Sequence, residues 1–264
     1  MRIYVEGIGL IAPGLPDWQA AAPVLAGTVP SLPAAVVVPA SSLLPAAERR
    51  RAGVPVKLAL AAGQEAFVNA GRDPAATATV FTSSSGDGEN LHRICEALAG
   101  AEREISPTRF HNSVHNAPAG YWSIATGSRE PSTSLCGHDA SFAAGLVDAF
   151  AQVVVDQVAV GLIACDHPYP EPLNEKRCIA ACVGVALVLT PQATPRSLMA
   201  LELHIEAAAG APTVMADPAL EALRLGVPAA RCLPLLAALA RGEAARVDLG
   251  YVGALQLRVL VTPC

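Results

Sequence analysis

The alternation of apolar and polar positions predicts strands and helices that follow one another along the chain. Residues 2–11 alternate and end at "APG", which is typical of a strand that runs into a turn. Residues 56–70 repeat apolar side chains at intervals of three and four and stop before Gly71, which predicts a helix. A buried strand ends at Phe81, and a Ser/Gly turn leads to a helix over 89–98. This alternation favours an α/β fold.

The rest of the chain continues the alternation. The remaining predicted elements are, in chain order, a helix over 17–26, an irregular segment with four prolines over 27–51, a helix over 117–126, a strand over 132–135, a helix over 140–155, a buried strand over 157–166, a loop over 166–177, strands over 179–189 and 198–206, helices over 218–225 and 228–240, and a closing strand over 254–261. We expect the strands over 179–189 and 198–206 to form an antiparallel hairpin.

The composition adds a large apolar fraction to this picture. Hydrophobic residues make up 52% of the 264 residues and charged residues 16%, so apolar area is available beyond the need of one core, and part of it is expected on an interface. No low-complexity linker divides the chain, and the apolar N-terminal stretch is too short to span a membrane. We therefore expect one soluble, cytoplasmic α/β domain over residues 1–264.

Charge and cysteine content exclude several function classes. The net charge of −5 gives no footprint for nucleic acid or an anionic membrane. The only dense basic run, residues 49–51, is expected in a solvated loop. The seven cysteines are odd in number, and Cys178 and Cys182 have no partners at zinc-finger spacing. We predict a reducing compartment, with neither a disulfide framework nor a metal site.

Two polar segments are candidate binding sites. The turn over 83–88 opens a helix and has free backbone N–H groups, but it carries neither the lysine of a phosphate loop nor the spacing of a dinucleotide fingerprint. We assign no cofactor to it. His111 and His115 are four residues apart, which on one helix would place both imidazoles on one face. No carboxylate lies near them in the segment, which favours structural or pocket-lining histidines over metal ligands.

The segment over 130–150 holds the densest cluster of reactive side chains. A strand, a tight turn and a helix carry Cys136, His138 and Asp139 within a few residues. A nucleophilic cysteine needs a base within hydrogen-bond reach and is activated at a helix N-terminus, so Cys136 with His138 is one candidate for catalysis. The residue chemistry favours Asp139 as the N-cap of the helix that begins near Ala140.

Taken in order, these segments resemble the N-terminal half of β-ketoacyl synthases, the condensing enzymes of the thiolase-like fold. "VEGIGLIAPG" resembles the family's opening strand and turn, "KLALAAGQEA" its alanine-rich helix, and "TSSSGDG" its glycine turn. "ISPTRFHNSVHNAPAGYWSIATGSREPSTS" is similar to the run that leads to the nucleophile, and "ACVGVALVL" to the strand that closes the half. The resemblance covers about residues 1–207. It implies a thiolase-like fold with a mixed central sheet and helices on both faces.

One departure from the family pattern falls on the nucleophile. Ketosynthases carry their cysteine in "P-S-x-S-x-x-T-A-C-x-S", and an ungapped match that begins at Pro131 puts Asp139 at its position. Cys136 falls three residues early, on the strand side of the turn. A carboxylate cannot form the acyl thioester that condensation requires. The resemblance therefore implies that Asp139 marks a lost nucleophile position.

The second departure concerns the length of the chain. A full ketosynthase repeats the βαβ plan in a second half that supplies two catalytic histidines. Here about 55 residues follow the matched part, and the last histidine of the chain is His204. We expect residues 208–264 to form a shortened C-terminal extension whose helices and strand cover the sheet where the second half would lie.

In both departures the chain resembles the chain length factors, which are ketosynthase-like partner subunits in type II polyketide systems. It most closely resembles the half-length type of aryl polyene and xanthomonadin-type pigment pathways. The resemblance implies a non-catalytic subunit that pairs with a full-length ketosynthase and helps to shape its acyl or polyene tunnel in polyketide or fatty-acid-like biosynthesis. An acyl-carrier protein is an additional candidate partner. The strand over 132–135 is implied to pair with its counterpart across the dimer. The pocket and interface residues implied are Phe110, His111, His115, Tyr121, Ser132, Ser134 and Leu135.

Two other functions are compatible with the sequence. One is a stand-alone acyltransferase or hydrolase that uses Cys136 with His138. The other is a homodimeric scaffold that binds an acyl-carrier protein without a ketosynthase partner. An acyl adduct on Cys136 would indicate the first function. Stability and solubility of the chain on its own would indicate the second, because exposed apolar surface makes an obligate partner subunit poorly soluble alone.

Overall fold

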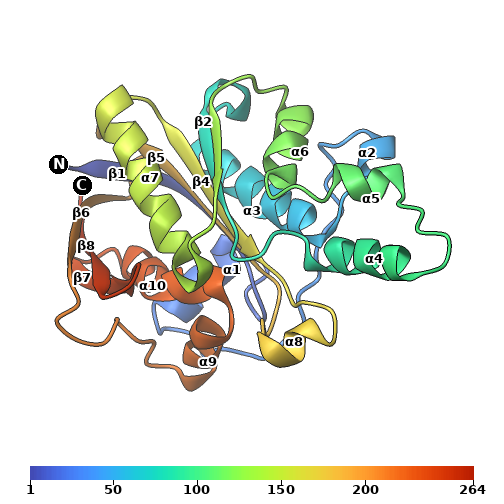
Figure 1. Cartoon of the computed structure of the whole chain (residues 1–264). Helices are drawn as coiled ribbons and strands as arrows, with labels where there is room; N and C mark the ends of the chain where they lie inside the picture. Colours follow the sequence, from blue (N-terminus) through green and yellow to red (C-terminus); the bar gives the residue numbers. More distant parts are fainter.

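One mixed β-sheet of eight strands runs through the computed structural model, which describes residues 1–264 (Figure 1). The strand order across the sheet is β3-β2-β4-β5-β1-β6-β8-β7. The strands are β1 (Ile3–Ile11), β2 (Ala78–Thr82), β3 (Ser132–Leu135), β4 (Val160–Asp166), β5 (Val183–Thr190), β6 (Met199–Ala207), β7 (Ala245–Gly250) and β8 (Leu255–Pro263). Strand β2 pairs in parallel with β3 and β4, and all other pairs are antiparallel.

Ten α-helices accompany the strands, and most were predicted from the apolar periodicity. They are α1 (Trp18–Leu25), α2 (Ala46–Arg51), α3 (Val54–Ala70), α4 (Gly88–Ala99), α5 (Pro107–His111), α6 (Ala117–Thr126), α7 (Ser141–Asp156), α8 (Leu173–Lys176), α9 (Pro218–Gly226) and α10 (Leu233–Arg241). Short 3₁₀ helices span Pro74–Ala76, His138–Ala140 and Pro228–Cys232. None of the helices is long and apolar enough to cross a bilayer.

Helices cover both faces of the sheet. On one face, α3 packs over β1, β4 and β5, and α6 packs beside it over β2 and β3, with Phe67 and Trp122 in contact at a ring-centroid distance of 5.3 Å. On the other face, α1, α7 and α10 bury the larger apolar cluster (Figure 1). Residues 208–264 contribute to this second face through α10 and extend the sheet through β7 and β8. The C-terminal residues are therefore an integral part of the core, and not a loose extension.

Strand β1 lies inside the sheet, which makes the predicted hairpin of residues 179–189 and 198–206 wrong. β1 pairs with β5 on one side and with β6 on the other. Apart from Tyr4 and from Glu6, which pairs with Arg72, its side chains are apolar, and Gly9 lets α3 approach, because a Cβ at Gly9 would overlap the carbonyl oxygen of Ala62. An apolar strand buried on both faces gains more from a central place than the later strands gain from pairing with each other.

Local sequence effects explain the other differences from the prediction. Residues 49–51 lie in α2 and not in a loop, since three arginines in the last turn complement the helix dipole. The predicted helix over 228–240 begins as a 3₁₀ helix, and α10 starts at Leu233, because Pro234 has no N–H and is tolerated only in a first turn. The short helices α5 and α8 and the strand β7 were not predicted.

Candidate functional site

Strand β3 passes into α7 through a tight turn that carries Asp139. A 3₁₀ helix spans His138–Ala140, and α7 begins at Ser141. The Ser141 hydroxyl donates to the carbonyl oxygen of His138 (2.6 Å) and accepts from the N–H of Gly137 (3.0 Å). These bonds hold His138 at a φ of 54°, a left-handed conformation that residues with a Cβ seldom adopt. The turn therefore has a fixed and strained shape.

Asp139 does not cap α7, so the N-cap prediction is wrong. Ala140 occupies the N-cap position without a side-chain hydrogen bond, because the 3₁₀ helix lies between the strand and α7. The Asp139 carboxylate instead accepts from Nη2 of Arg177 (3.0 Å) and Nη2 of Arg231 (3.4 Å), and Nδ1 of His138 lies 3.6 Å from its Oδ1. Two guanidinium groups from distant parts of the chain hold this carboxylate.

Arg177 connects the Asp139 turn to the serine-rich turn over 83–88. Its Nη2 donates to the hydroxyl of Ser84 (2.7 Å) as well as to Asp139. The thiol of Cys136 also bonds to Ser84, through the carbonyl oxygen (3.3 Å). The serine-rich turn thus anchors the Asp139 turn.

A buried carboxylate, Asp166 at the end of β4, lies behind the serine-rich turn. Asp166 is 1% exposed. It accepts from the Ser84 N–H (2.8 Å), the Ser83 hydroxyl (3.2 Å) and the Ala229 N–H (2.8 Å). Burial raises the pKa of Asp166 to about 7, although these hydrogen bonds act in the opposite direction. Asp166 therefore joins β4, the serine-rich turn and the 3₁₀ helix Pro228–Cys232.

Cys136 and His138, the pair considered for catalysis, are not brought together. The Cys136 thiol is bonded to Ser84, and the His138 side chain is 71% exposed, with Asp139 as its charged neighbour. No hydrogen bond joins the thiol to the imidazole. The arrangement offers no base next to the thiol, which nucleophilic catalysis by Cys136 would need.

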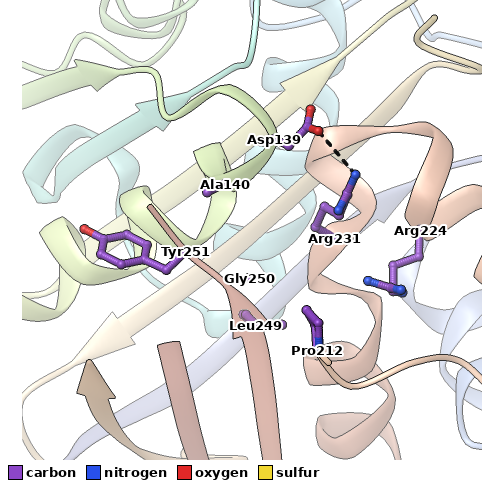
Figure 2. Close-up of a pocket in the computed structure, with 8 residues that line it drawn as sticks. All are labelled: Asp139, Ala140, Pro212, Arg224, Arg231, Leu249, Gly250 and Tyr251. Atoms are coloured by element: carbon purple, nitrogen blue, oxygen red, sulfur yellow. Dashed lines mark hydrogen bonds and ion pairs between the residues drawn. The ribbon is translucent and has the colours of Figure 1, made fainter. Parts of the chain in front are cut away.

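A cavity of about 120 Å³ opens next to the Asp139 turn (Figure 2). It is lined by Asp139, Ala140, Pro212, Arg224, Arg231, Leu249, Gly250 and Tyr251. Figure 2 shows Arg231 pointing at Asp139, while Arg224 reaches toward the cavity from α9 and Tyr251 forms the opposite wall. Residues 212–251 thus supply most of the surface that the Asp139 turn faces.

Three of the predicted interface residues lie together at the free edge of β3. His115, Ser132 and Ser134 line an open polar cavity of about 520 Å³ between β3 and α6. The Ser134 hydroxyl is buried without a hydrogen-bond partner, and Leu135 packs half-buried against the core. The structure therefore places His115, Ser132 and Ser134 together at the free edge of β3.

Of the remaining predicted pocket residues, two lie on the surface and one lies in the core. Phe110 is 69% exposed and His111 is also exposed, whereas Tyr121 is 2% exposed and donates to Oδ1 of Asn112 (3.1 Å). Helix α5 ends at His111, so His115 is not on the same helix. No group of three or more His, Cys, Asp or Glu side chains is arranged to hold a metal ion. Tyr121 is a core residue, and Phe110 and His111 are available to a partner.

Sequence reasoning missed the two arginines that define the surroundings of Asp139. Arg177 lies in the segment after α8 and Arg231 in the 3₁₀ helix before α10, and neither position carries a motif. Asp166 had a usable signal, because an acidic residue that ends a wholly apolar strand is a candidate for a buried polar contact. The arginines had none, since only the tertiary fold brings them to the turn.

The chain matches one known family over most of its length. The family profile described as β-ketoacyl synthase, N-terminal domain, matches residues 18–225, which include the Asp139 turn. The chain belongs to this β-ketoacyl synthase family. The match confirms the resemblance seen in the sequence. No curated protein matches this β-ketoacyl synthase family member significantly.

Solved structures share the fold of this β-ketoacyl synthase family member at low sequence identity. The ketosynthase ApeO in complex with its chain length factor ApeC from Xenorhabdus doucetiae matches with a TM-score of 0.74 and 21% identity, over 98% of this chain and 99% of that chain. The ishigamide ketosynthase/chain length factor matches with a TM-score of 0.74 and 16% identity, over 100% and 99%. The AntDE:AntF complex of a type II polyketide ketosynthase with its acyl-carrier protein matches with a TM-score of 0.75 and 12% identity, over the same shares. The thiolase-like fold is confirmed.

Proposed function

We propose that this chain is a non-catalytic β-ketoacyl synthase-like subunit, a chain length factor, that pairs with a full-length ketosynthase and helps to shape its acyl or polyene tunnel. The observation that carries the proposal is the Asp139 turn. The family places a cysteine nucleophile here, and this chain has a carboxylate bound by Arg177 and Arg231. A carboxylate neutralised by two guanidinium groups supports a structural contact better than thioester chemistry.

The free edge of β3 supports pairing through the sheet. Thr79 N–H donates to the Pro131 carbonyl (3.0 Å), and Ser83 N–H donates to the Leu135 carbonyl (3.4 Å). Because backbone groups alternate along a strand, the N–H and C=O groups of residues 132 and 134 point away from β2. β3 is the last strand on its side of the sheet, so these groups are available to a strand of another subunit.

Exposed apolar side chains on α5, on α6 and between them support the same interface. Phe110 on α5, Val114 on the connection and Ile124 on α6 are 69%, 52% and 48% exposed, and α6 contacts β3. Large exposed apolar side chains are typical of a subunit interface. The proposed interface consists of the β3 edge and these three residues.

A cationic cleft supports an acyl-carrier protein as a second partner. The cleft has a volume of about 400 Å³ and is lined by four cations, Arg50, Arg51, Lys57 and Arg109, and by two carboxylates, Asp87 and Glu89, among mostly polar residues. Arg51 pairs with Glu48 (3.1 Å), and the other three cations have no ion-pair partner. In a chain of net charge −5, this local excess of positive charge favours a partner with an acidic surface.

Co-expression with the full-length β-ketoacyl synthase of the same organism tests the proposal. We expect the two chains to purify as a 1:1 complex that condenses acyl-carrier-protein substrates, while this chain alone takes up no acyl group from an acyl thioester. A stable homodimer that ignores the ketosynthase would contradict the pairing. An acyl adduct on Cys136, detected as a mass shift that Cys136→Ala abolishes, would instead indicate the stand-alone acyltransferase.

A further inference from the structure

The side chains in and next to the cavity beside Asp139 carry more positive than negative charge. Arg224 and Arg231 line the cavity, and Arg177 binds the lining residue Asp139; these three guanidinium groups pair with only two carboxylates, Asp139 and Glu221. One positive charge is therefore left without a partner in the protein. The excess matches a bound monoanion.

The unmatched charge lies on Arg231. Arg224 is 5% exposed and makes two short hydrogen bonds to Glu221 (2.7 and 2.6 Å), so its charge is paired. Arg231 makes only two long contacts, both of 3.4 Å, to Asp139 and to the Leu225 carbonyl. Its Nε is buried without any acceptor. A buried donor without an acceptor is unfavourable, so Arg231 has hydrogen-bonding capacity that the protein leaves unused.

The other walls of the cavity set the size and polarity of a ligand. Pro212, Leu249 and Tyr251 present apolar surface, and Gly250 leaves room beside them (Figure 2). The volume of about 120 Å³ corresponds to roughly four water molecules. That space fits a few carbon atoms together with one carboxylate group.

We propose that this cavity binds a short-chain monocarboxylate, whose carboxylate pairs with the guanidinium group of Arg231 and whose alkyl part contacts Pro212, Leu249 and Tyr251. The planar fork of an arginine matches a carboxylate in geometry and charge. The Asp139 carboxylate also lines the cavity and repels a second negative charge, which disfavours dianions. The inference is independent of pairing with a ketosynthase, because every group involved belongs to this chain.

Thermal unfolding of the purified chain with sodium butyrate as the probe tests this site. We expect 20 mM butyrate to raise the melting temperature by about 3 °C over the same ionic strength of sodium chloride. Arg231→Gln should abolish the rise. Arg246→Gln is the matched control, since Arg246 lies on β7 in an exposed pair with Asp248 and does not line this cavity. The rise should persist in this control.

A second variant keeps the test valid if Arg231→Gln fails to fold. Gly250 lines the cavity, and a Cβ there meets only a carbon of Pro212 at 3.7 Å, an ordinary contact. Gly250→Val should therefore fold, fill the cavity and remove the butyrate effect. The proposal is overturned if butyrate gives no rise beyond sodium chloride, if the rise survives in Gly250→Val or in folded Arg231→Gln, or if phosphate gives the same rise as butyrate.

Discussion

Asp139 has an electrostatic environment that limits its contribution to folding as well as its reactivity. The side chain is 44% exposed, and its partners Arg177 and Arg231 are 26% and 33% exposed. Water screens ion pairs of this kind, and double-mutant cycles on exposed pairs typically give less than about 1 kcal/mol. Asp139 therefore links the turn before α7 to the C-terminal residues without being essential to the fold.

Replacing Asp139 should leave the proposed complex active. We expect Asp139→Ala to lower the free energy of unfolding by at most about 1 kcal/mol, because only partly exposed ion pairs are lost. Condensation by the complex with a ketosynthase should remain within about twofold of the wild type, since this proposal gives Asp139 no chemical step. Urea denaturation and a condensation assay measure the two effects. Loss of condensation with the fold preserved would assign Asp139 a catalytic role.

Asp166 should make the stability of the protein depend on pH. Its folded pKa of about 7 lies above the ordinary value of 3.8, so the folded state retains a proton that the unfolded state releases. The stabilisation is complete below pH 3.8 and is lost as the pH rises through about 7. We expect a loss of about 2 kcal/mol from pH 5 to pH 8, measured by urea denaturation at each pH.

The variant Asp166→Asn serves as the control for this pH dependence. It should flatten the profile between pH 5 and pH 8, because asparagine does not titrate. Burial lowers the pKa of the neighbouring His167, which gives a slope of opposite sign below about pH 6.5. That slope is common to both proteins and cancels in their difference. Identical profiles for the wild type and Asp166→Asn would show that Asp166 does not titrate in this range.

At the scale of elements, β3 can be tested through its outward-facing backbone. The N–H of Ser134 points away from β2, so Ser134→Pro removes no bond of the sheet but blocks one bond to a partner strand. We expect Ser134→Pro to abolish co-purification with the ketosynthase, while circular dichroism shows a folded chain. Ser134→Ala keeps the N–H and should co-purify normally. Normal co-purification of folded Ser134→Pro would mean that β3 does not pair across the interface.

Elements with strong local signals could be predicted from the sequence, and their arrangement could not. The helix over 117–126 and the strand over 132–135 agree with α6 and β3 to the residue, because Pro118 in the first turn and Gly127 after the last residue delimit α6. The central place of β1 and the contacts of Arg177 and Arg231 with Asp139 depend on tertiary packing. No local pattern encodes them, so the turn was recognised but its charged partners were not.

At the scale of the whole molecule, charge is distributed unevenly. The chain is acidic overall, yet Arg50, Lys57 and Arg109 converge in one cleft without ion-pair partners. Two carboxylates also line the cleft: Asp87 accepts from the N–H of Asn90 (3.0 Å), and Glu89 pairs with Arg93 (2.8 Å). Such a local field mainly affects the rate and affinity of association with an acidic surface.

Charge reversal in this cleft should weaken binding of an acyl-carrier protein and leave the ketosynthase interface intact. We expect Arg50→Glu with Lys57→Glu to lower the affinity of the ketosynthase complex for the carrier protein at least about tenfold at low salt, measured by calorimetry. The difference from the wild type should shrink at 0.5 M salt, because screening weakens exposed charges. Lys176→Glu with Arg241→Glu changes the net charge by the same amount and is the control, because both residues are exposed, lie outside the cleft and have no ion pair. If the cleft variant and this control lose the same affinity for the carrier protein, the effect comes from total charge and not from the cleft. If the affinity of the cleft variant is unchanged, the carrier protein binds the ketosynthase alone.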